Sequence, residues 1–96
     1  MPLFVYQGRD SAQGLALRKL HREKHLAHLA GLDSAGRIRF AGPLINAEQN
    51  PCGSVIVLEA DSFEAAREIA ENDPYMLEGI FASVEVFETK GVFPAS

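Results

Sequence analysis

Short apolar stretches and one long stretch rich in Leu, Ala and Lys make up the first half of the chain. Residues 2–7 (PLFVYQ) carry aromatic and β-branched side chains and stop at Gly8, which predicts a strand. Residues 10–36 predict a long helix that Asp10 or Ser11 can cap. The region from Gly31 to Gly36 ends this helix.

The second half of the chain predicts three strands and a second helix. Residues 37–43 alternate charged and apolar side chains and stop at Pro43, which is typical of an edge strand. Residues 44–53 (LINAEQNPCG) predict a loop of about ten residues, a length that is often functional. Residues 54–60 (SVIVLEA) are the strongest predicted strand. Residues 61–73 predict a short amphipathic helix with an Asp or Ser cap. Asp73 and Pro74 suit the start of a further helical turn, and residues 81–90 predict the last strand.

The order of these elements, β-α-β-β-α-β, defines the expected fold of one domain, residues 1–96. Right-handed crossovers turn this order into an α+β ferredoxin-like sandwich, a four-stranded antiparallel sheet with both helices on one face. In residues 54–60, Val55 and Val57 point to one face while Ile56 and Leu58 point to the other, so both faces are apolar. Because the helices cover one face only, we expect a homodimer that packs through the open face.

Composition and charge narrow the classes of partner. The chain is 47% hydrophobic and 23% charged, as expected of a globular protein, and its net charge of −4 argues against nucleic-acid binding. No apolar run approaches the length of a membrane span, and the first residues lack the features of a signal peptide. The single cysteine, Cys52, cannot form an internal disulfide, which fits a reducing compartment. These features predict a cytoplasmic protein with no membrane partner.

Three histidines in the first predicted helix are the main candidates for chemistry. His21, His25 and His28 fall within an arc of roughly 60° on the helix surface. A metal site is disfavoured, because the chain lacks the Cys/His spacing of zinc sites. A histidine base needs a carboxylate that fixes its tautomer, and Asp73 is a candidate. Spacing does not decide whether Asp73 is such a partner or a helix cap alone.

Several segments together resemble the YciI-like (YCII-related) family, whose fold is the dimeric ferredoxin-like α+β barrel. The similarity rests on "REKHLAHL" from Arg22, "GRIRFAGPL" with Gly42 and Pro43, and the long segment from "GSVIVLEA" to "NDPYMLEGIF". It runs over nearly the whole chain. The resemblance implies a histidine–aspartate pair at an active site, which is His25 and Asp73 by position. His21 and His28 have no counterpart in the family pattern.

The resemblance also implies a class of reaction. One similar protein removes chloride from a chlorinated hydroxyhydroquinone, and the wider fold superfamily includes muconolactone isomerases and small monooxygenases. These precedents suggest proton abstraction from a small, polar or anionic ring compound, in a lyase-, isomerase- or dehydrochlorinase-like reaction. His25 is then the base and Asp73 orients it. Further expected substrate contacts come from four residues: Arg22, Ser54, Tyr75 and His28.

Other functions remain open at this point. No nucleotide, flavin or haem motif is present, so cofactor-free chemistry is the simplest form. A dimeric metabolite-binding protein without catalysis, or an accessory subunit that docks a partner, would suit the same fold. The roles of His21 and Cys52 are not assigned.

Overall fold

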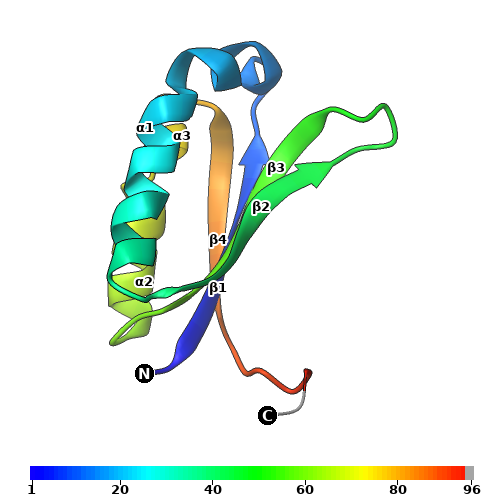
Figure 1. Cartoon of the computed structure of the whole chain (residues 1–96). Helices are drawn as coiled ribbons and strands as arrows, with labels where there is room; N and C mark the ends of the chain where they lie inside the picture. The colour runs from blue at the N-terminus through cyan, green and yellow to red at the C-terminus, as the bar shows by residue number, and fades with distance from the viewer. Residues whose placement is uncertain (95–96) are drawn as a thin grey trace.

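The computed structural model describes residues 1–94 and contains four strands and three helices in this range (Figure 1). The strands form one antiparallel sheet in the order β2-β3-β1-β4, and the helices pack on one face of it (Figure 1). The predicted ferredoxin-like βαββαβ fold is confirmed, and the last two residues of the predicted domain lie outside the described range. The elements are β1 (Leu3–Asp10), α1 (Gly14–Ser34), β2 (Ile38–Ile45), β3 (Pro51–Glu59), α2 (Phe63–Glu71), α3 (Pro74–Leu77) and β4 (Phe81–Thr89).

The start of α1 differs from the prediction. Gln13 is the N-cap and makes no side-chain cap hydrogen bond, so neither Asp10 nor Ser11 caps the helix. Asp10 instead belongs to β1, where its carboxylate binds the Arg18 guanidinium. The Ser11 hydroxyl donates to the main-chain oxygen of Gly79 at 2.8 Å. Both candidate caps therefore bind other groups, Asp10 the Arg18 side chain of α1 and Ser11 the distant Gly79.

The predicted ten-residue loop is wrong, because half of its residues belong to strands. β2 continues past Pro43 to Ile45, and β3 already begins at Pro51. Residues 46–50 close the hairpin, where the Asn46 side chain accepts hydrogen bonds from two main-chain N–H groups of the turn. Pro43 does not stop the strand because β2 lies at the sheet edge, where a missing N–H is tolerated. The hairpin extends away from the helices (Figure 1).

The two short helices begin with side-chain caps, as the sequence predicts. Of the two candidates for α2, Ser62 is the cap, and its hydroxyl accepts from the Ala65 N–H at 3.1 Å. Asp73 caps α3 and Pro74 occupies its first turn. Gly79 follows with a φ of 79°, a left-handed conformation that favours glycine.

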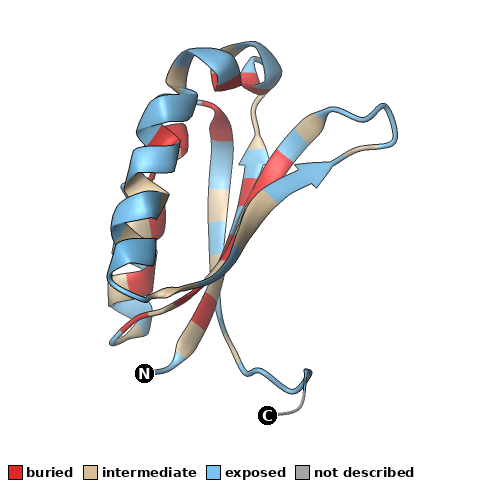
Figure 2. Ribbon diagram, in the orientation of Figure 1, coloured by how far each residue is buried: buried red, intermediate tan, exposed pale blue. Residues whose placement is uncertain are grey.

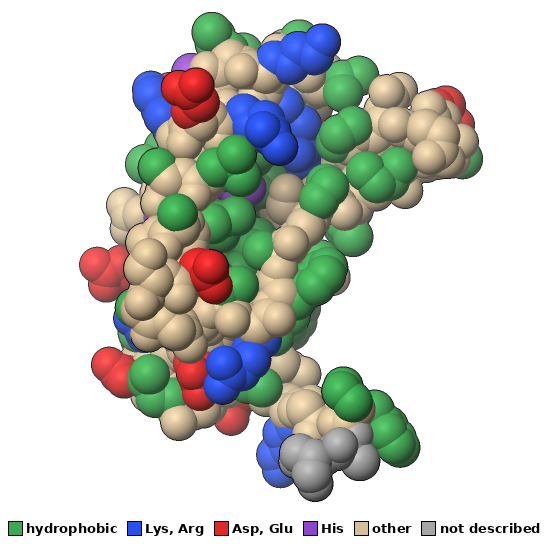
Figure 3. All heavy atoms as spheres, in the orientation of Figure 1, with side chains coloured by type: hydrophobic (Ala, Val, Ile, Leu, Met, Phe, Trp, Pro, Cys, Tyr) green, Lys and Arg blue, Asp and Glu red, His purple; other side chains and the backbone are tan. Residues whose placement is uncertain are grey.

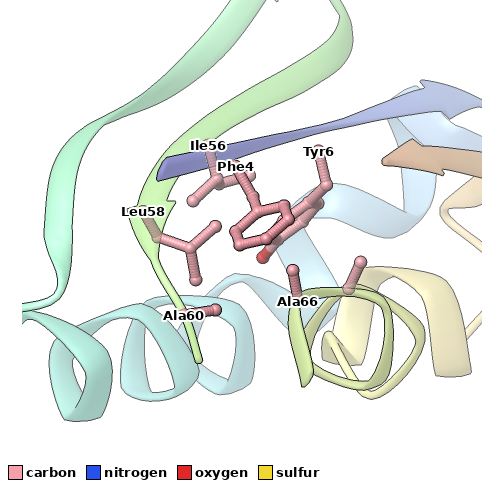
Figure 4. Close-up of a cluster of buried hydrophobic side chains, with 7 residues drawn as sticks. Phe4, Tyr6, Ile56, Leu58, Ala60 and Ala66 are labelled. Carbon is pink, nitrogen blue, oxygen red and sulfur yellow. The ribbon is translucent and has the colours of Figure 1, made fainter. Parts of the chain in front are cut away.

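The main core lies between the sheet and the helices (Figure 4). Buried and more exposed residues alternate along β1 and β3, because successive side chains point to opposite faces of the sheet (Figure 2). Phe4 and Tyr6 of β1 pair with Leu58 and Ile56 of β3, and all four side chains are buried. A second buried cluster, formed by Tyr75, Ile80 and Phe81, connects α3 to β4 beside α1. These two clusters enclose the polar residues described next.

Candidate active site

Helix α1 turns a polar stripe toward the interior of the molecule. Its buried residues are Gly14, Arg18 and His25, whose spacing places them on one helix face. His25 is 7% exposed, and its Nδ1 lies 2.8 Å from Oδ1 of Asp73. The structure thus brings together the histidine and the aspartate that the resemblance implies.

Asp73 is fully buried, and both oxygens of its carboxylate are held. Oδ1 accepts from the His25 ring and from the Tyr75 main-chain N–H at 2.9 Å, while Oδ2 accepts from the Tyr6 hydroxyl at 2.8 Å. Burial by itself raises the pKa of Asp73, but the hydrogen bond and charge of His25, with the Tyr75 and Tyr6 bonds, lower the pKa below its ordinary value overall. Asp73 is therefore ionised at neutral pH, and it serves as helix cap and histidine partner together.

This contact determines what the His25 ring can do. An ionised carboxylate only accepts hydrogen bonds, so the ring nitrogen that faces it, Nδ1, carries the hydrogen. In the neutral ring, Nε2 then holds the lone pair. The charge of Asp73 also stabilises the imidazolium that forms when Nε2 takes up a proton. Such a pair is suited to general-base catalysis.

Aromatic rings fix the plane of the histidine. The Tyr75 ring stacks on the His25 ring with centroids 3.9 Å apart and planes 3° apart. Phe81 packs edge-on against both rings, at 6.4 Å from His25 and 5.6 Å from Tyr75. Phe81 occupies space beside Gly8, where a Cβ would lie 2.4 Å from its ring carbons. A side chain at position 8 would therefore collide with a ring that packs against the histidine.

Arg18 is a site residue that the sequence analysis missed. It binds the Asp10 carboxylate through Nε at 2.7 Å and Nη2 at 2.8 Å, and Nη2 also donates to the Gly53 main-chain oxygen at 2.9 Å. A longer contact of 3.3 Å reaches the Ser54 hydroxyl, and the guanidinium lies 5.1 Å from the Tyr75 ring centroid. Its position seven residues before His25, on the same helix face, is the signal that could have identified it.

A cleft of about 1050 Å³ opens between α1 and the β2–β3 part of the sheet. Figure 3 shows this hollow beside α1, with histidine visible inside it and Lys and Arg side chains gathered at its upper end. His25 lines the cleft, so one member of the dyad forms part of the cleft wall. The other lining residues come from α1 and the segment before it (Ala12, Leu15, Ala16, Arg18, Lys19, Arg22, Leu26, Leu29), from β2, β3 and the turn between them (Ala41, Gly42, Pro43, Asn50, Pro51, Ser54, Ile56) and from α3 (Tyr75).

Three of the four predicted substrate contacts line this cleft. Ser54 and Tyr75 are buried in its wall, and Arg22 is exposed at its surface. Burial raises the pKa of the Tyr75 phenol, although the charges of Arg18 and Arg22 act in the opposite direction. Arg22 therefore lies close enough to influence groups in the cleft wall.

His28, the fourth predicted contact, does not line the cleft. It is half-buried, and its Nε2 has no hydrogen-bond partner within residues 1–94. Burial lowers the pKa of His28, although the Asp73 charge opposes this effect. His21 is likewise half-buried and its Nδ1 has no partner in the same range. Of the three histidines, only His25 reaches both the aspartate and the cleft.

Cys52 lies away from the dyad. It is exposed, and its Sγ is 3.5 Å from the main-chain oxygen of Leu44. It borders a smaller hollow of about 340 Å³ together with Arg9 and Glu85. That hollow lies on the sheet face opposite the helices, since Arg9 alternates with the buried residues of β1.

Two further findings concern the residues that the structure describes. Within residues 1–94, no three His, Cys, Asp or Glu side chains are grouped so that they could hold a metal ion. In the same range, no helix is both long enough and apolar enough to cross a membrane.

The fold belongs to a class of protein with known relatives. Residues 3–90 match the YCII-related domain, so the chain belongs to the YCII-related domain family. Protein YciI of Escherichia coli O6:H1 is 36% identical over 97 residues, covering 95% of this chain and 99% of that protein. A protein of Haemophilus influenzae is 34% identical over 97 residues, covering 94% of this chain and 98% of its own length.

Among solved structures, one that is similar to this chain is that of an enzyme. The chain resembles the 5-chloro-2-hydroxyhydroquinone dehydrochlorinase TftG of Burkholderia phenoliruptrix AC1100, solved with 2,5-dihydroxybenzoquinone, with a TM-score of 0.81 and 30% identity. The match covers 92% of this chain and 93% of TftG. A NIPSNAP domain protein from Burkholderia xenovorans, at 12% identity and a TM-score of 0.53, covers 100% of this chain and shares the fold alone.

Proposed function

We propose that this YciI-like protein is a small-molecule enzyme in which His25 abstracts a proton from a substrate bound in the cleft. The observation that carries the proposal is the 2.8 Å contact between His25 Nδ1 and the buried Asp73 carboxylate, in a histidine that lines the cleft. The His25 base takes the proton at Nε2, and the electron pair of the broken bond stays on the substrate. Asp73 balances the positive charge on the ring.

The substrate class is a small polar or anionic molecule. The dehydrochlorinase TftG, at 30% identity, supports a ring compound from which a proton and a leaving group depart. Arg22 is positioned on the cleft surface to attract an anionic oxygen, and Ser54 and Tyr75 supply hydrogen-bonding groups in its wall. His28 is assigned a lesser role, because it does not line the cleft. No cofactor takes part in the proposed step.

The tautomer of the His25 ring tests the dyad directly. The ionised Asp73 carboxylate accepts from the ring and holds the hydrogen of the neutral form on Nδ1. In NMR spectra of the ring nitrogens, Asp73→Asn is expected to weaken the preference of His25 for the Nδ1–H tautomer. His21, whose Nδ1 has no partner within residues 1–94, serves as the internal control, and its ring signals are expected to stay unchanged.

Turnover provides the second test. His25→Gln and Asp73→Asn are each expected to abolish conversion of small phenolic or quinone-like ring compounds, while His21→Gln retains it. If all three histidines ignore the Asp73 change, Asp73 is a helix cap only and the base role is refuted. If a ligand stabilises the protein thermally but no product forms, the protein is a binding module instead.

A homodimer through the open sheet face is part of the proposal. Phe40, Val57, Val5 and Phe87 form one cross-strand row on the face opposite the helices. Phe40 and Phe87 are 57% and 50% exposed, and covering each large side chain contributes about 1.5–3 kcal/mol. Phe87→Lys is expected to dissociate the dimer in sedimentation, whereas Leu20→Lys on α1 leaves it intact. A stable wild-type monomer at micromolar concentration contradicts this arrangement.

A further inference from the structure

Two unpaired cations lie side by side on the cleft surface. Lys19 and Arg22 are one helical turn apart on α1, and both line the cleft. Neither forms an ion pair within residues 1–94, whereas the charge of the neighbouring Arg18 is balanced by Asp10. No Asp or Glu lines the cleft, although the whole chain carries a net charge of −4. The upper end of the cleft therefore complements an anion.

The rest of the cleft is apolar. Below the cations, Leu26 and Leu29 of α1 line it from one side, and Ala41 of β2 and Ile56 of β3 line it from the other. Ala41 and Ile56 are register partners, so they form a continuous wall. Figure 3 shows hydrophobic side chains inside the hollow beneath the Lys and Arg groups. This end favours an apolar body over water.

The dimensions of the cleft leave room for a ligand longer than one ring. Arg22 and Leu29 are seven residues apart on α1, which corresponds to about 10 Å along the helix. His25 lies between these two levels. A single six-membered ring cannot contact both ends, and the volume of about 1050 Å³ exceeds what such a ring fills.

We propose that the cleft binds an amphipathic oxyanion, whose anionic group lies at Lys19 and Arg22 and whose apolar body lies along Leu26, Leu29 and Ile56. The inference names the ligand class of the proposed active site and rests on the proposed function for the use of that site. In this arrangement, the part of the ligand that joins its anionic group to its apolar body lies beside His25. The specificity of the site then comes from the combination of the two ends.

Binding of three simple probes tests the combination. Calorimetry is expected to show that octanoate binds at least about tenfold more tightly than acetate, which has the head group alone, or 1-octanol, which has the body alone. Main-chain NMR shifts on addition of octanoate are expected in α1, β2 and β3 around the cleft. Raising the NaCl concentration is expected to weaken octanoate binding, because the two cations are exposed.

Matched variants separate the two ends of the cleft. Lys19→Gln with Arg22→Gln is expected to weaken octanoate binding about tenfold, while Lys24→Gln, on the same helix outside the cleft, leaves it unchanged. Leu26→Ser is expected to weaken octanoate about fivefold without affecting acetate. Leu20→Ser is its control, because Leu20 is 74% exposed and does not line the cleft.

The outcomes distinguish this inference from the proposed function. Octanoate binding that responds to the charge and Leu26 variants supports it, even if the His25 ring signals are unchanged in Asp73→Asn and the base role is refuted. Octanoate affinity equal in the Lys19/Arg22 and Lys24 variants overturns it, as do shifts confined to the outer sheet face. A His25 tautomer that depends on Asp73, without octanoate binding, leaves the base role standing and refutes the amphipathic ligand.

Discussion

The Tyr6→Phe substitution tests how the site holds its buried charge. It removes only the hydroxyl that donates to Asp73 Oδ2 at 2.8 Å. Tyr6 and Asp73 are both 0% exposed, so water does not replace the lost donor. Oδ2 has no other hydrogen-bond partner within residues 1–94, and the carboxylate keeps the two bonds to Oδ1. The variant therefore leaves one oxygen of an ionised, buried group without a hydrogen bond.

The expected loss follows from the charge of the acceptor. A hydrogen bond to a charged group contributes about 1.5–3 kcal/mol, so we expect the free energy of unfolding to fall by about 2 kcal/mol. For a domain of this size, this loss lowers Tm by about 10 °C. The pKa of Asp73 is also expected to rise, because the Tyr6 bond is one of the contacts that lower it.

Urea unfolding of a small set of variants provides the assay. Tyr75→Phe is the matched control, because the Tyr75 hydroxyl donates to an uncharged main-chain oxygen of Arg18 at 3.2 Å and its loss costs about 1 kcal/mol. In the Asp73→Asn background, Tyr6→Phe is expected to cost about 1 kcal/mol less than in the wild type. Equal costs for Tyr6→Phe in both backgrounds would refute the reasoning.

Three further predictions concern packing, the buried ion pair and pH. Gly8→Ala is expected to lower stability by about 2 kcal/mol in urea unfolding, because its Cβ would collide with the Phe81 ring at 2.4 Å; an unchanged midpoint would contradict this. Arg18→Met is expected to lose about 3–5 kcal/mol, since it leaves Asp10 buried without its partner, and adding Asp10→Asn should recover part of the loss in the same assay. The pKa of His28 is lowered in the folded state, so its contribution to stability is present above pH 6.5 and is lost as the pH falls through the lower folded value. His28→Asn is therefore expected to flatten the dependence of Tm on pH below 6.5, and an unchanged slope would count against burial of the neutral ring.

Local signals in the sequence were sufficient for the order and type of the elements. Apolar alternation, the Ser62 and Asp73 caps and Pro74 predict strands and helix starts because each depends on neighbours within a few residues. The β2–β3 hairpin was underestimated for the converse reason. Pairing of Leu44 with Gly53 and of Ile45 with Pro51 extends both strands, and such pairing is a contact between segments.

The residues of the candidate site could not be identified from their spacing in the sequence alone. The helical period placed His21, His25 and His28 on one arc but did not choose among them. His25 and Asp73 were joined by resemblance to the YCII-related family, and the structure shows their contact. A bond across 48 residues leaves no periodic trace in the sequence, because each partner also has an ordinary local role.

The sequence by itself thus determined the alternating elements, the caps of the short helices and the apolar faces of the strands. Tertiary structure alone decided that Asp10 binds Arg18 instead of capping α1, and that Tyr6 completes the hydrogen bonds of Asp73. It also decided that one histidine of three reaches the cleft. The physical reason is that a buried charge takes whichever donors the fold brings within reach, and these lie on other strands and helices, as Tyr6 lies 67 residues from Asp73 in the chain.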